Sequence, residues 1–142
     1  MSLQVKDMNK IVICSAMILS PAGNMLMVRK RSSAYFQLPG GKIAAGESDM
    51  AALTRELKEE LGLEVEVTAL RFIGNHVTQA VNEPDTLVEG HIYAMTLGME
   101  TVFRPQAELE EVVWISKEHW QMYRLAHLAA EFVVPKWLSG VF

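Results

Sequence analysis

The sequence predicts a single α/β (α+β) domain in which a sheet built from several strands is covered by helices. The 142 residues suit one domain, and a chain of that length can bury roughly two-thirds of its unfolded surface in one core. Runs of β-branched and aliphatic residues alternate with an amphipathic helical segment at 48–62 and a second apolar segment near the C-terminus. No repeat, low-complexity tract or linker divides the chain, so we expect one domain over residues 1–142.

The first part of the chain predicts a hairpin and a short strand. Residues 10–20 are mostly aliphatic and predict a buried strand, and the turn-forming residues 21–24 follow them. Residues 25–29 predict the returning strand of the hairpin. Residues 36–38 predict a short strand, which ends where Pro39 removes a backbone donor.

A helix is expected between Ser48 and Gly62. Ser48 is a suitable N-cap, and Asp49 adds negative charge where the helix dipole favours it. Gly62 can adopt the left-handed conformation that ends many helices. Aliphatic residues at helical spacing predict the buried face, and these are Met50, Leu53, Leu57 and Leu61.

The second half of the chain predicts three more strands. Residues 65–77 and 88–97 are suited to long strands, with Gly74 as a bulge in the first of them. Loop-forming residues at 82–85 separate these two strands. Residues 111–115 predict a last, short strand.

Two helices are expected after the last strand. Ser116 is a suitable N-cap for a helix over residues 117–123. Residues 125–138 predict a second helix, which Pro135 is expected to shorten or kink.

Composition argues against several classes of protein. A net charge of −4 disfavours a general nucleic-acid-binding surface, since such binding depends on neutralising phosphates. No apolar run is long enough to span a membrane, and the N-terminus lacks a secretory pattern. The single cysteine, Cys14, cannot form an internal disulfide, and its apolar neighbours favour a buried structural thiol over a nucleophile. We therefore expect a cytoplasmic protein with no membrane or nucleic-acid partner, in which Lys30 and Arg31 are the solvated end of a strand.

Four glutamates and one arginine stand at fixed intervals between Gly41 and Leu63. Three of them, Glu56, Glu59 and Glu60, fall at i, i+3 and i+4 and so share one face of the helix. Like charges this close repel one another, so stability alone does not explain them, whereas a hard divalent cation bound by oxygen ligands does. A solvated Glu/Lys helix is the alternative interpretation.

The spacing of these residues decides between the two interpretations. It reads G-x5-E-x7-R-E-U-x-E-E-x-G-U, with U aliphatic, and fixes nine positions in 23 residues. This pattern resembles the signature of the Nudix (MutT/Nudix) hydrolases without a departure, and residues 38–42 resemble the small, nucleotide-sanitising MutT-like branch. The resemblance is strict over 41–63 and looser over 10–116. It implies a Nudix-type α/β/α sandwich around a central mixed sheet, and hydrolysis of a nucleoside diphosphate linked to a further group.

The resemblance also implies a metal site. One to three Mg²⁺ or Mn²⁺ ions are expected to activate water for attack on a phosphorus atom. Glu59, Glu60 and the Gly40 carbonyl are the implied ligands, with Glu56 as a ligand or as the acceptor of the water's proton. Glu108 stands at the spacing of a further acidic ligand in the MutT-like branch. Its acidic neighbours at 110 and 111 are alternatives, and so is a solvated loop.

Further roles follow from the same resemblance. Arg55 would orient the neighbouring glutamates, Glu47 would anchor Arg55, and the identity of the general base stays open. Arg29 aligns with a phosphate-contacting arginine, and Leu38 could line a base pocket. His127 falls near the position where the 8-oxo-dGTP-hydrolysing branch reads a purine edge with an asparagine. A histidine offers different donors and acceptors, which puts oxidised-guanine specificity in doubt, and a core or surface histidine is the alternative.

The expected substrate is a small nucleotide. The sequence lacks the zinc-ribbon cysteines of larger NADH pyrophosphatases and the separate N-terminal domain of many ADP-ribose hydrolases. This favours a nucleoside triphosphate, canonical or oxidised, cleaved to the monophosphate and pyrophosphate. An ADP-sugar or a dinucleoside polyphosphate is the alternative substrate, and a non-catalytic nucleotide sensor is the alternative class. The complete set of acids favours an enzyme, and both a monomer and a homodimer are compatible with the sequence.

Overall fold

Six strands form one mixed sheet in the computed structural model, which describes residues 9–140. The strands are β1 (Asn9–Leu19), β2 (Met25–Lys30), β3 (Gly40–Lys42), β4 (Arg71–Gln79), β5 (Thr86–Thr96) and β6 (Leu109–Ile115). Their order is β4-β5-β1-β2-β6, β3 pairs with β1, and only the pairing of β1 with β5 is parallel. Residues 1–8 and 141–142 of the expected domain lie outside the described range.

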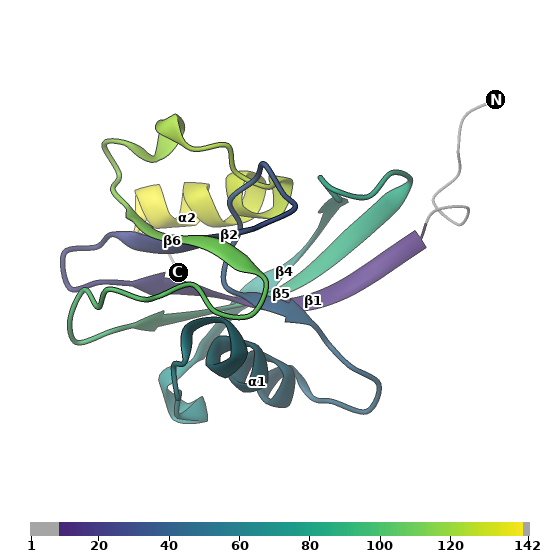
Figure 1. Ribbon diagram of the computed structural model, residues 1–142, viewed down its shortest axis with the longest axis horizontal. Helices are drawn as coiled ribbons and strands as arrows, with labels where there is room; N and C mark the ends of the chain where they lie inside the picture. The colour runs from purple at the N-terminus through teal and green to yellow at the C-terminus, as the bar shows by residue number, and fades with distance from the viewer. Residues whose placement is uncertain (1–8, 141–142) are drawn as a thin grey trace.

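Helices cover both faces of this sheet. The helix α1 (Asp49–Leu61) lies on one face, and the π-helical segment η4 (Ala129–Val133) with α2 (Val134–Ser139) lies on the other (Figure 1). The mixed sheet between helical layers confirms the predicted α/β/α sandwich. None of the helices in residues 9–140 is long and apolar enough to cross a membrane.

Each face of the sheet has its own apolar core because side chains alternate along β1. Cys14, Ala16 and Ile18 of β1 pack with Leu53 and the other apolar residues of α1. The alternate residues of β1 point to the opposite face, where they join the core that includes η4 and α2. Cys14 is fully buried, and burial, with a contribution from Asp49, raises the pKa of its thiol to about 12. The expectation of a buried thiol is confirmed.

Strands β1 and β2 separate beyond their turn, and residues 36–42 lie between them. Gln37 exchanges two backbone hydrogen bonds with Val28 of β2, at 2.7 and 2.9 Å. The carbonyl of Pro39 accepts a hydrogen bond from the Ala16 amide of β1 at 2.9 Å. This insertion brings the start of β3 to the middle of the sheet, next to α1.

The ends of α1 are those that the sequence predicts. The Ser48 hydroxyl accepts a hydrogen bond from the Ala51 amide at 3.1 Å, which caps the first turn. Gly62 has φ 66° and donates its N–H to the Lys58 carbonyl, which ends the helix. Strands β1, β2, β5 and β6 also begin and end within two residues of their predicted limits.

Two strand predictions need correction. Residues 36–38 form only isolated bridges, and the short strand lies at β3 instead, where the lack of a Cβ on Gly40 permits close pairing with β1. The predicted strand at 65–77 is wrong in its first part, since η2 (Val67–Ala69) is a 3₁₀ turn and β4 runs from Arg71 to Gln79. The predicted bulge at Gly74 is confirmed by a register shift between Phe72 and Gly74.

The predicted helix at 117–123 is wrong. Only the 3₁₀ turn η3 (Trp120–Met122) forms there. The Ser116 hydroxyl is hydrogen-bonded to the His119 ring at 3.0 Å, so it does not cap a helix as predicted. Aromatic side chains at Trp120 and Tyr123 pack against the core, and these residues have low helix propensity.

The C-terminal helical segment starts later than the predicted 125–138. Leu125 forms a parallel bridge with Phe36 instead. The Val134 amide bonds to the Ala129 carbonyl, five residues back, which makes η4 a widened turn. Pro135 follows directly, and it has no backbone N–H with which to donate an α-helical hydrogen bond to a preceding carbonyl. Pro135 does not shorten the segment, which continues to Ser139, and a π-helical turn lies directly before it.

Candidate active site

Glu60 is a buried carboxylate near the C-terminal end of α1. The residue is 2% exposed, and its Oε1 accepts a hydrogen bond from the Gly40 amide at 3.0 Å. The other oxygen, Oε2, is buried and has no hydrogen-bond partner. Burial raises the pKa of Glu60 to about 8; the Gly40 and Lys30 groups lower it, and the nearby Glu56 and Glu108 carboxylates raise it further. A buried carboxylate in this state is stabilised by a cation.

Arg55 holds three of the other predicted site residues together. Its Nε and Nη2 donate to the two oxygens of Glu47 at 2.7 and 2.8 Å. Its Nη1 contacts Glu56 at 2.9 Å and Glu59 at 3.5 Å, and Nη2 also donates to the Lys42 carbonyl at 3.2 Å. The guanidinium therefore connects the loop after β3 with the acidic face of α1.

The charges of this network differ in their environment. The hydrogen bond from Arg55, followed by that from the Ala44 amide, lowers the pKa of Glu47 to about 2. Burial raises the pKa of Glu56 although the bond from Arg55 opposes it. Glu47 is thus a fixed anion that anchors Arg55, while Glu56 and Glu60 are acids whose charge needs a neighbouring cation.

Two adjacent glycines let the backbone approach these acids. A Cβ on Gly41 would lie 2.5 Å from the carboxyl carbon of Glu56, so the carboxylate occupies space that any other residue would fill. Gly40 has φ 142°, and a Cβ there would lie 2.2 Å from the Cys14 carbonyl oxygen. Gly41 makes room for a side chain, whereas Gly40 makes room for the backbone of β1.

The donor set fits a hard divalent cation. Within residues 9–140 no three His, Cys, Asp or Glu side chains are arranged as metal ligands. Glu56 and Glu59 contact Arg55 instead. The unpartnered Oε2 of Glu60 and the carboxylates on the same helix face are nevertheless oxygen donors of the kind that Mg²⁺ and Mn²⁺ prefer. Glu60 is therefore the residue around which such a site would form.

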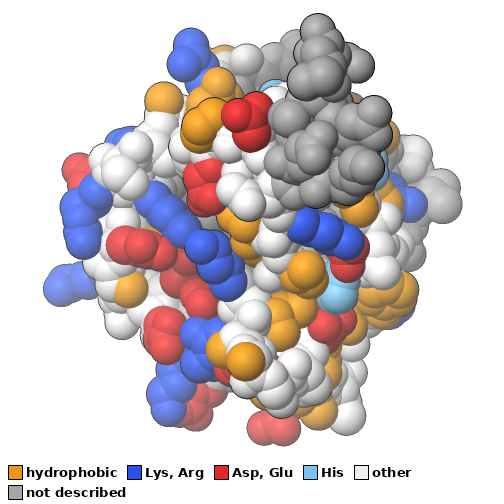
Figure 2. Space-filling view, turned by 90° about the vertical axis from the view of Figure 1, so that its right-hand side faces the viewer, with side chains coloured by type: hydrophobic (Ala, Val, Ile, Leu, Met, Phe, Trp, Pro, Cys, Tyr) orange, Lys and Arg blue, Asp and Glu red, His pale blue; other side chains and the backbone are white. Residues whose placement is uncertain are grey.

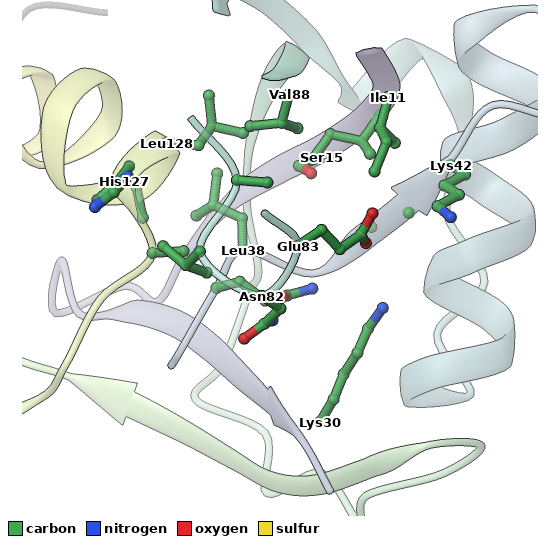
Figure 3. Close-up of a pocket in the computed structure, with 18 of the residues that line it drawn as sticks. Ile11, Ser15, Lys30, Leu38, Lys42, Asn82, Glu83, Val88, His127 and Leu128 are labelled. Atoms are coloured by element: carbon green, nitrogen blue, oxygen red, sulfur yellow. The ribbon is translucent and has the colours of Figure 1, made fainter. Parts of the chain in front are cut away.

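A cavity of about 140 Å³ opens beside these glycines (Figure 3). The start of β1, the β4–β5 connection and the start of the C-terminal helical segment form its walls. The Lys30 and Lys42 amines lie at the end nearest α1, and Leu38, Leu128 and His127 lie at the opposite end (Figure 3). One end of the cavity thus carries two lysines together with the Glu83 carboxylate, and the other end is largely apolar.

The predicted substrate residues do not all lie in this cavity. Leu38 and Gly40 line it, and so does His127, whose Nδ1 is 3.0 Å from the Gln79 carbonyl oxygen. A carbonyl only accepts, so Nδ1 carries the proton and Nε2 is the acceptor of the neutral ring. Glu108 is mostly exposed and pairs with Lys30 at 3.3 Å between Oε1 and Nζ.

The structure places Lys30 at the cavity and Arg29 away from it, the reverse of what the sequence suggests. Arg29 does not line the cavity, because its Nε bonds to Glu111 at 3.0 Å and its Nη1 to the Ser33 carbonyl at 2.9 Å. Lys30, interpreted from the sequence as solvated, lines the cavity instead. The register of β2 shifts between these two residues, so period-two alternation could not indicate which of them faces the site.

The β4–β5 connection contributes residues that the sequence analysis missed. Asn82 and Glu83 line the cavity, and Asn82 Oδ1 accepts a hydrogen bond from the Ser33 hydroxyl at 3.1 Å. This bond ties the connection to the loop after β2. Nothing in the local sequence of residues 82–85 distinguishes a cavity wall from any other polar loop.

Comparisons with known proteins agree with this geometry. The family model described as NUDIX domain matches residues 9–134. A Mycobacterium tuberculosis protein, provisionally named 8-oxo-dGTP diphosphatase 2, is 37% identical over 123 residues, which cover 76% of this chain and 82% of that protein.

Solved structures share the fold. The MutT protein from Methanosarcina mazei Go1 has a TM-score of 0.77 at 20% identity, over 98% of each chain. The E. coli ORF135 protein has a TM-score of 0.65 at 24% identity, over 97% of this chain and 93% of that one. At such identities the likeness concerns the fold alone, whereas the family model spans the residues of the candidate site. The chain belongs to the Nudix family, and it is a MutT-like Nudix pyrophosphohydrolase.

Proposed function

We propose that this enzyme hydrolyses a small nucleoside triphosphate to the monophosphate and pyrophosphate with the help of Mg²⁺ or Mn²⁺. The observation that carries the proposal is the buried Glu60 carboxylate, whose Oε2 has no partner, beside a cavity with two lysines at one end and apolar side chains at the other. Nudix hydrolases generally use divalent metal ions, and the name of the mycobacterial relative supports a nucleoside triphosphate.

The metal would be held by acids of α1. Glu56, Glu59, Glu60 and the Gly40 carbonyl are the proposed ligands, and Glu108 is the proposed outer one. When bound, such ions polarise phosphoryl oxygens and lower the pKa of water. Glu60 already accepts a hydrogen bond from the Gly40 amide. This bond holds the carboxylate and the loop in one position before any ligand binds.

Arg55 and Glu47 would position these ligands. Glu47 holds the guanidinium through two short bonds and stays ionised. Arg55 donates to Glu56 at 2.9 Å and to Glu59 at 3.5 Å, and a bound cation would compete with it for these carboxylates. Glu56 would then be released as a ligand or as the acceptor of the water's proton.

The cavity supports the orientation of the nucleotide. Lys30 and Lys42 lie at the end near α1, where cationic amines would bind the phosphates (Figure 3). Leu38 and Leu128 at the other end would contact the base, with the Nε2 of His127 as an acceptor for a base N–H. We propose these lysines rather than Arg29 as the phosphate contacts, since Arg29 does not line the cavity and its Nε and Nη1 donate to Glu111 and the Ser33 carbonyl.

The size of the cavity favours a substrate with one enclosed base over a substrate with two enclosed nucleosides. Its volume of about 140 Å³ lies below the roughly 300–1,000 Å³ of typical ligand pockets. One base fits such a space better than the two nucleosides of a dinucleoside polyphosphate. An ADP-sugar remains the second candidate, because its additional group could extend past the exposed Glu83.

We also propose a cytoplasmic enzyme that acts on free nucleotides. A single buried thiol suits a reducing compartment. On the face shown in Figure 2, Lys and Arg side chains are interspersed with Asp and Glu and form no continuous basic surface. A nucleic-acid partner is therefore not part of the proposal.

The test is a substrate screen with two readouts. Canonical and oxidised dNTPs, ADP-ribose and diadenosine polyphosphates are assayed with Mg²⁺ and with Mn²⁺ for pyrophosphate and phosphate release, and for thermal stabilisation. We expect pyrophosphate and a monophosphate from a triphosphate. Faster cleavage of ADP-ribose would favour the second candidate, and stabilisation without product would favour a sensor.

A variant pair links the activity to the site. Glu60→Gln is expected to lower kcat at least about 100-fold without loss of folded structure by circular dichroism. The control is Glu131→Gln, an exposed glutamate that pairs with His76 on the other face of the sheet. Wild-type turnover by Glu60→Gln would overturn the assignment.

A further inference from the structure

The N-terminal end of α1 is tied to β5 by a chain of charged side chains outside the cavity and the acidic set. Asp49 accepts hydrogen bonds from His91 Nδ1, at 3.0 and 3.1 Å to its two oxygens, and from the Tyr93 hydroxyl at 2.9 Å. The other ring nitrogen of His91, Nε2, is 2.7 Å from Glu89 Oε2. Glu89 Oε1 in turn pairs with Lys10 Nζ at 2.6 Å. The chain thus crosses α1, β5 and β1.

The partners of His91 define its charge. Ionised carboxylates only accept hydrogen bonds, so both ring nitrogens must donate when both bonds are made. The ring is then an imidazolium between Asp49 and Glu89. Burial lowers the pKa of His91, but the hydrogen bonds to Asp49 and Glu89 outweigh it, and the pKa is raised overall. With Lys10 the chain pairs two positive groups with two negative groups.

The acids of α1 depend on where the helix lies. The Glu56 carboxylate sits so close to Gly41 that a single added Cβ would come within 2.5 Å of it. A small shift of α1 along its axis would therefore move Glu56 and Glu60 relative to the glycine backbone. Asp49 is about 10 Å from Glu56 and about 16 Å from Glu60 along a straight helix, so it can affect them only through the helix.

We infer that His91, in its charged form, is a positioning residue for the metal-binding carboxylates, acting through Asp49 to fix the axial position of α1. The inference rests on the metal site proposed above. It gives the clamp, defined as Asp49, His91, Tyr93, Glu89 and Lys10, a pH dependence of its own. Metal affinity loses the contribution of the clamp as His91 is deprotonated.

The direction of this dependence follows from the raised pKa of His91. A histidine whose pKa is raised in the folded protein contributes its full stabilisation below the unfolded pKa, about 6.5. That stabilisation is lost as the pH rises through the pKa of the folded protein. The charged or titratable groups that face it are Asp49 from α1, Glu89 and Tyr93 from β5, and Lys10 and Cys14 from β1.

Tyr93, Cys14 and Glu89 do not change their protonation state while His91 titrates. Burial above all raises the pKa values of Tyr93 and Cys14 to about 12. The hydrogen bond from Lys10, followed by that from His91, lowers the pKa of Glu89. None of the three changes charge between about pH 6.5 and 9.

The test measures the binding of Mn²⁺ alone by calorimetry, at pH 6.5 and at pH 9, with the full chain. His91→Gln should bind Mn²⁺ about 3- to 10-fold more weakly than the wild type at pH 6.5. The ratio should fall toward one at the higher pH, because deprotonation of His91 removes the same charge from the wild type. Protonation of Glu60 affects both proteins alike and cancels in the ratio.

His76→Gln is the matched control. His76 Nε2 pairs with Glu131 at 2.9 Å, so it is also a histidine–carboxylate pair, but it joins β4 to the C-terminal helical layer and does not contact α1. This variant should bind Mn²⁺ like the wild type at both pH values. In the wild type, NMR titration of the His91 ring should give a higher midpoint than in Asp49→Asn.

Unchanged Mn²⁺ affinity in His91→Gln, or a ratio that is the same at both pH values, overturns the inference. If that variant does not fold, Tyr93→Phe removes one donor to Asp49 and keeps the ring contact with Phe72. Affinity equal to the wild type in Tyr93→Phe would then overturn it. Glu60→Gln is measured beside them: wild-type affinity in that variant would refute the metal site and the inference with it, whereas a loss there with unchanged affinity in His91→Gln would refute the inference alone.

Discussion

Glu60 is a single residue held in an energetically costly state, which the proposed metal site would explain. Its carboxylate is 2% exposed, one oxygen has no partner, and burial raises its pKa to about 8. The unfolded chain releases this proton near pH 4.5, the ordinary value. Between these two values the folded protein holds more protons, so the metal-free protein loses stability as the pH rises from about 4.5 to 8.

Glu60→Gln should therefore stabilise the metal-free protein at alkaline pH. At pH 8.5 with a chelator we expect a gain of about 2 kcal/mol in the free energy of unfolding, less than the full linkage value because water can enter the site. At pH 4.5 the two proteins should differ little. Urea titrations at both pH values measure this, and an equal difference at both would contradict the prediction. Saturating Mg²⁺ should reverse the order of stability at pH 8.5.

At the scale of single elements, the glycines that begin β3 separate folding from catalysis. In Gly41→Ala the new Cβ meets the far end of a flexible side chain, the Glu56 carboxylate, which can move away. In Gly40→Ala the Cβ meets the Cys14 carbonyl oxygen at 2.2 Å, at a φ of 142° that alanine rarely adopts. The first change should displace a catalytic group, and the second should distort the pairing with β1.

These two substitutions give opposite expected results. Gly41→Ala should lose at least about 10-fold in kcat with a stability change under about 1 kcal/mol. Gly40→Ala should lower the free energy of unfolding by about 3 kcal/mol or more. Kinetics and urea unfolding on both variants check this. A Gly41→Ala enzyme with wild-type kcat would show that Glu56 does not need its present position.

The elements that the sequence predicts well are those with local signals. The helix α1 has a capping serine, a terminal glycine and an apolar stripe, and each acts within a few residues. Strand β3 has no such signal, because Gly40 and Gly41 are poor strand formers. They occupy this position beside β1 because neighbouring atoms leave no room for a Cβ. The side that Lys30 faces depends on a bulge opposite β6, which no local pattern indicates.

At the scale of the whole molecule, the candidate site joins parts that are distant in the sequence. The acidic helix α1 lies on one face of the sheet, and the C-terminal segment that supplies His127 and Leu128 lies on the other (Figure 1). The separation of β1 from β2 lets residues 36–42 pass between them and connect the two sides. The sequence pattern indicates the acids because their spacing is local, whereas the cavity exists only after the layers have assembled.

Trp137 ties the C-terminal layer to the sheet. It is 1% exposed, packs in the core on the face opposite α1, and donates from Nε1 to the Gly23 carbonyl in the β1–β2 turn at 2.8 Å. Trp137→Phe keeps an aromatic ring but removes the donor and part of the buried volume. We expect a loss of about 1–3 kcal/mol in the free energy of unfolding, with kcat and Mn²⁺ affinity close to wild type because the acidic set belongs to the other core.

Leu138→Ala is the control for this prediction, since Leu138 lies on the same helix and is 44% exposed. It should change stability by no more than about 0.5 kcal/mol. Urea unfolding gives the stabilities, and steady-state kinetics at 25 °C gives kcat and KM. If the two helical layers contribute separately, Trp137→Phe lowers the urea midpoint without a change in kcat. A fall in kcat in the folded variant would instead show that the C-terminal layer affects the site, through its wall of the cavity or through the sheet beneath α1.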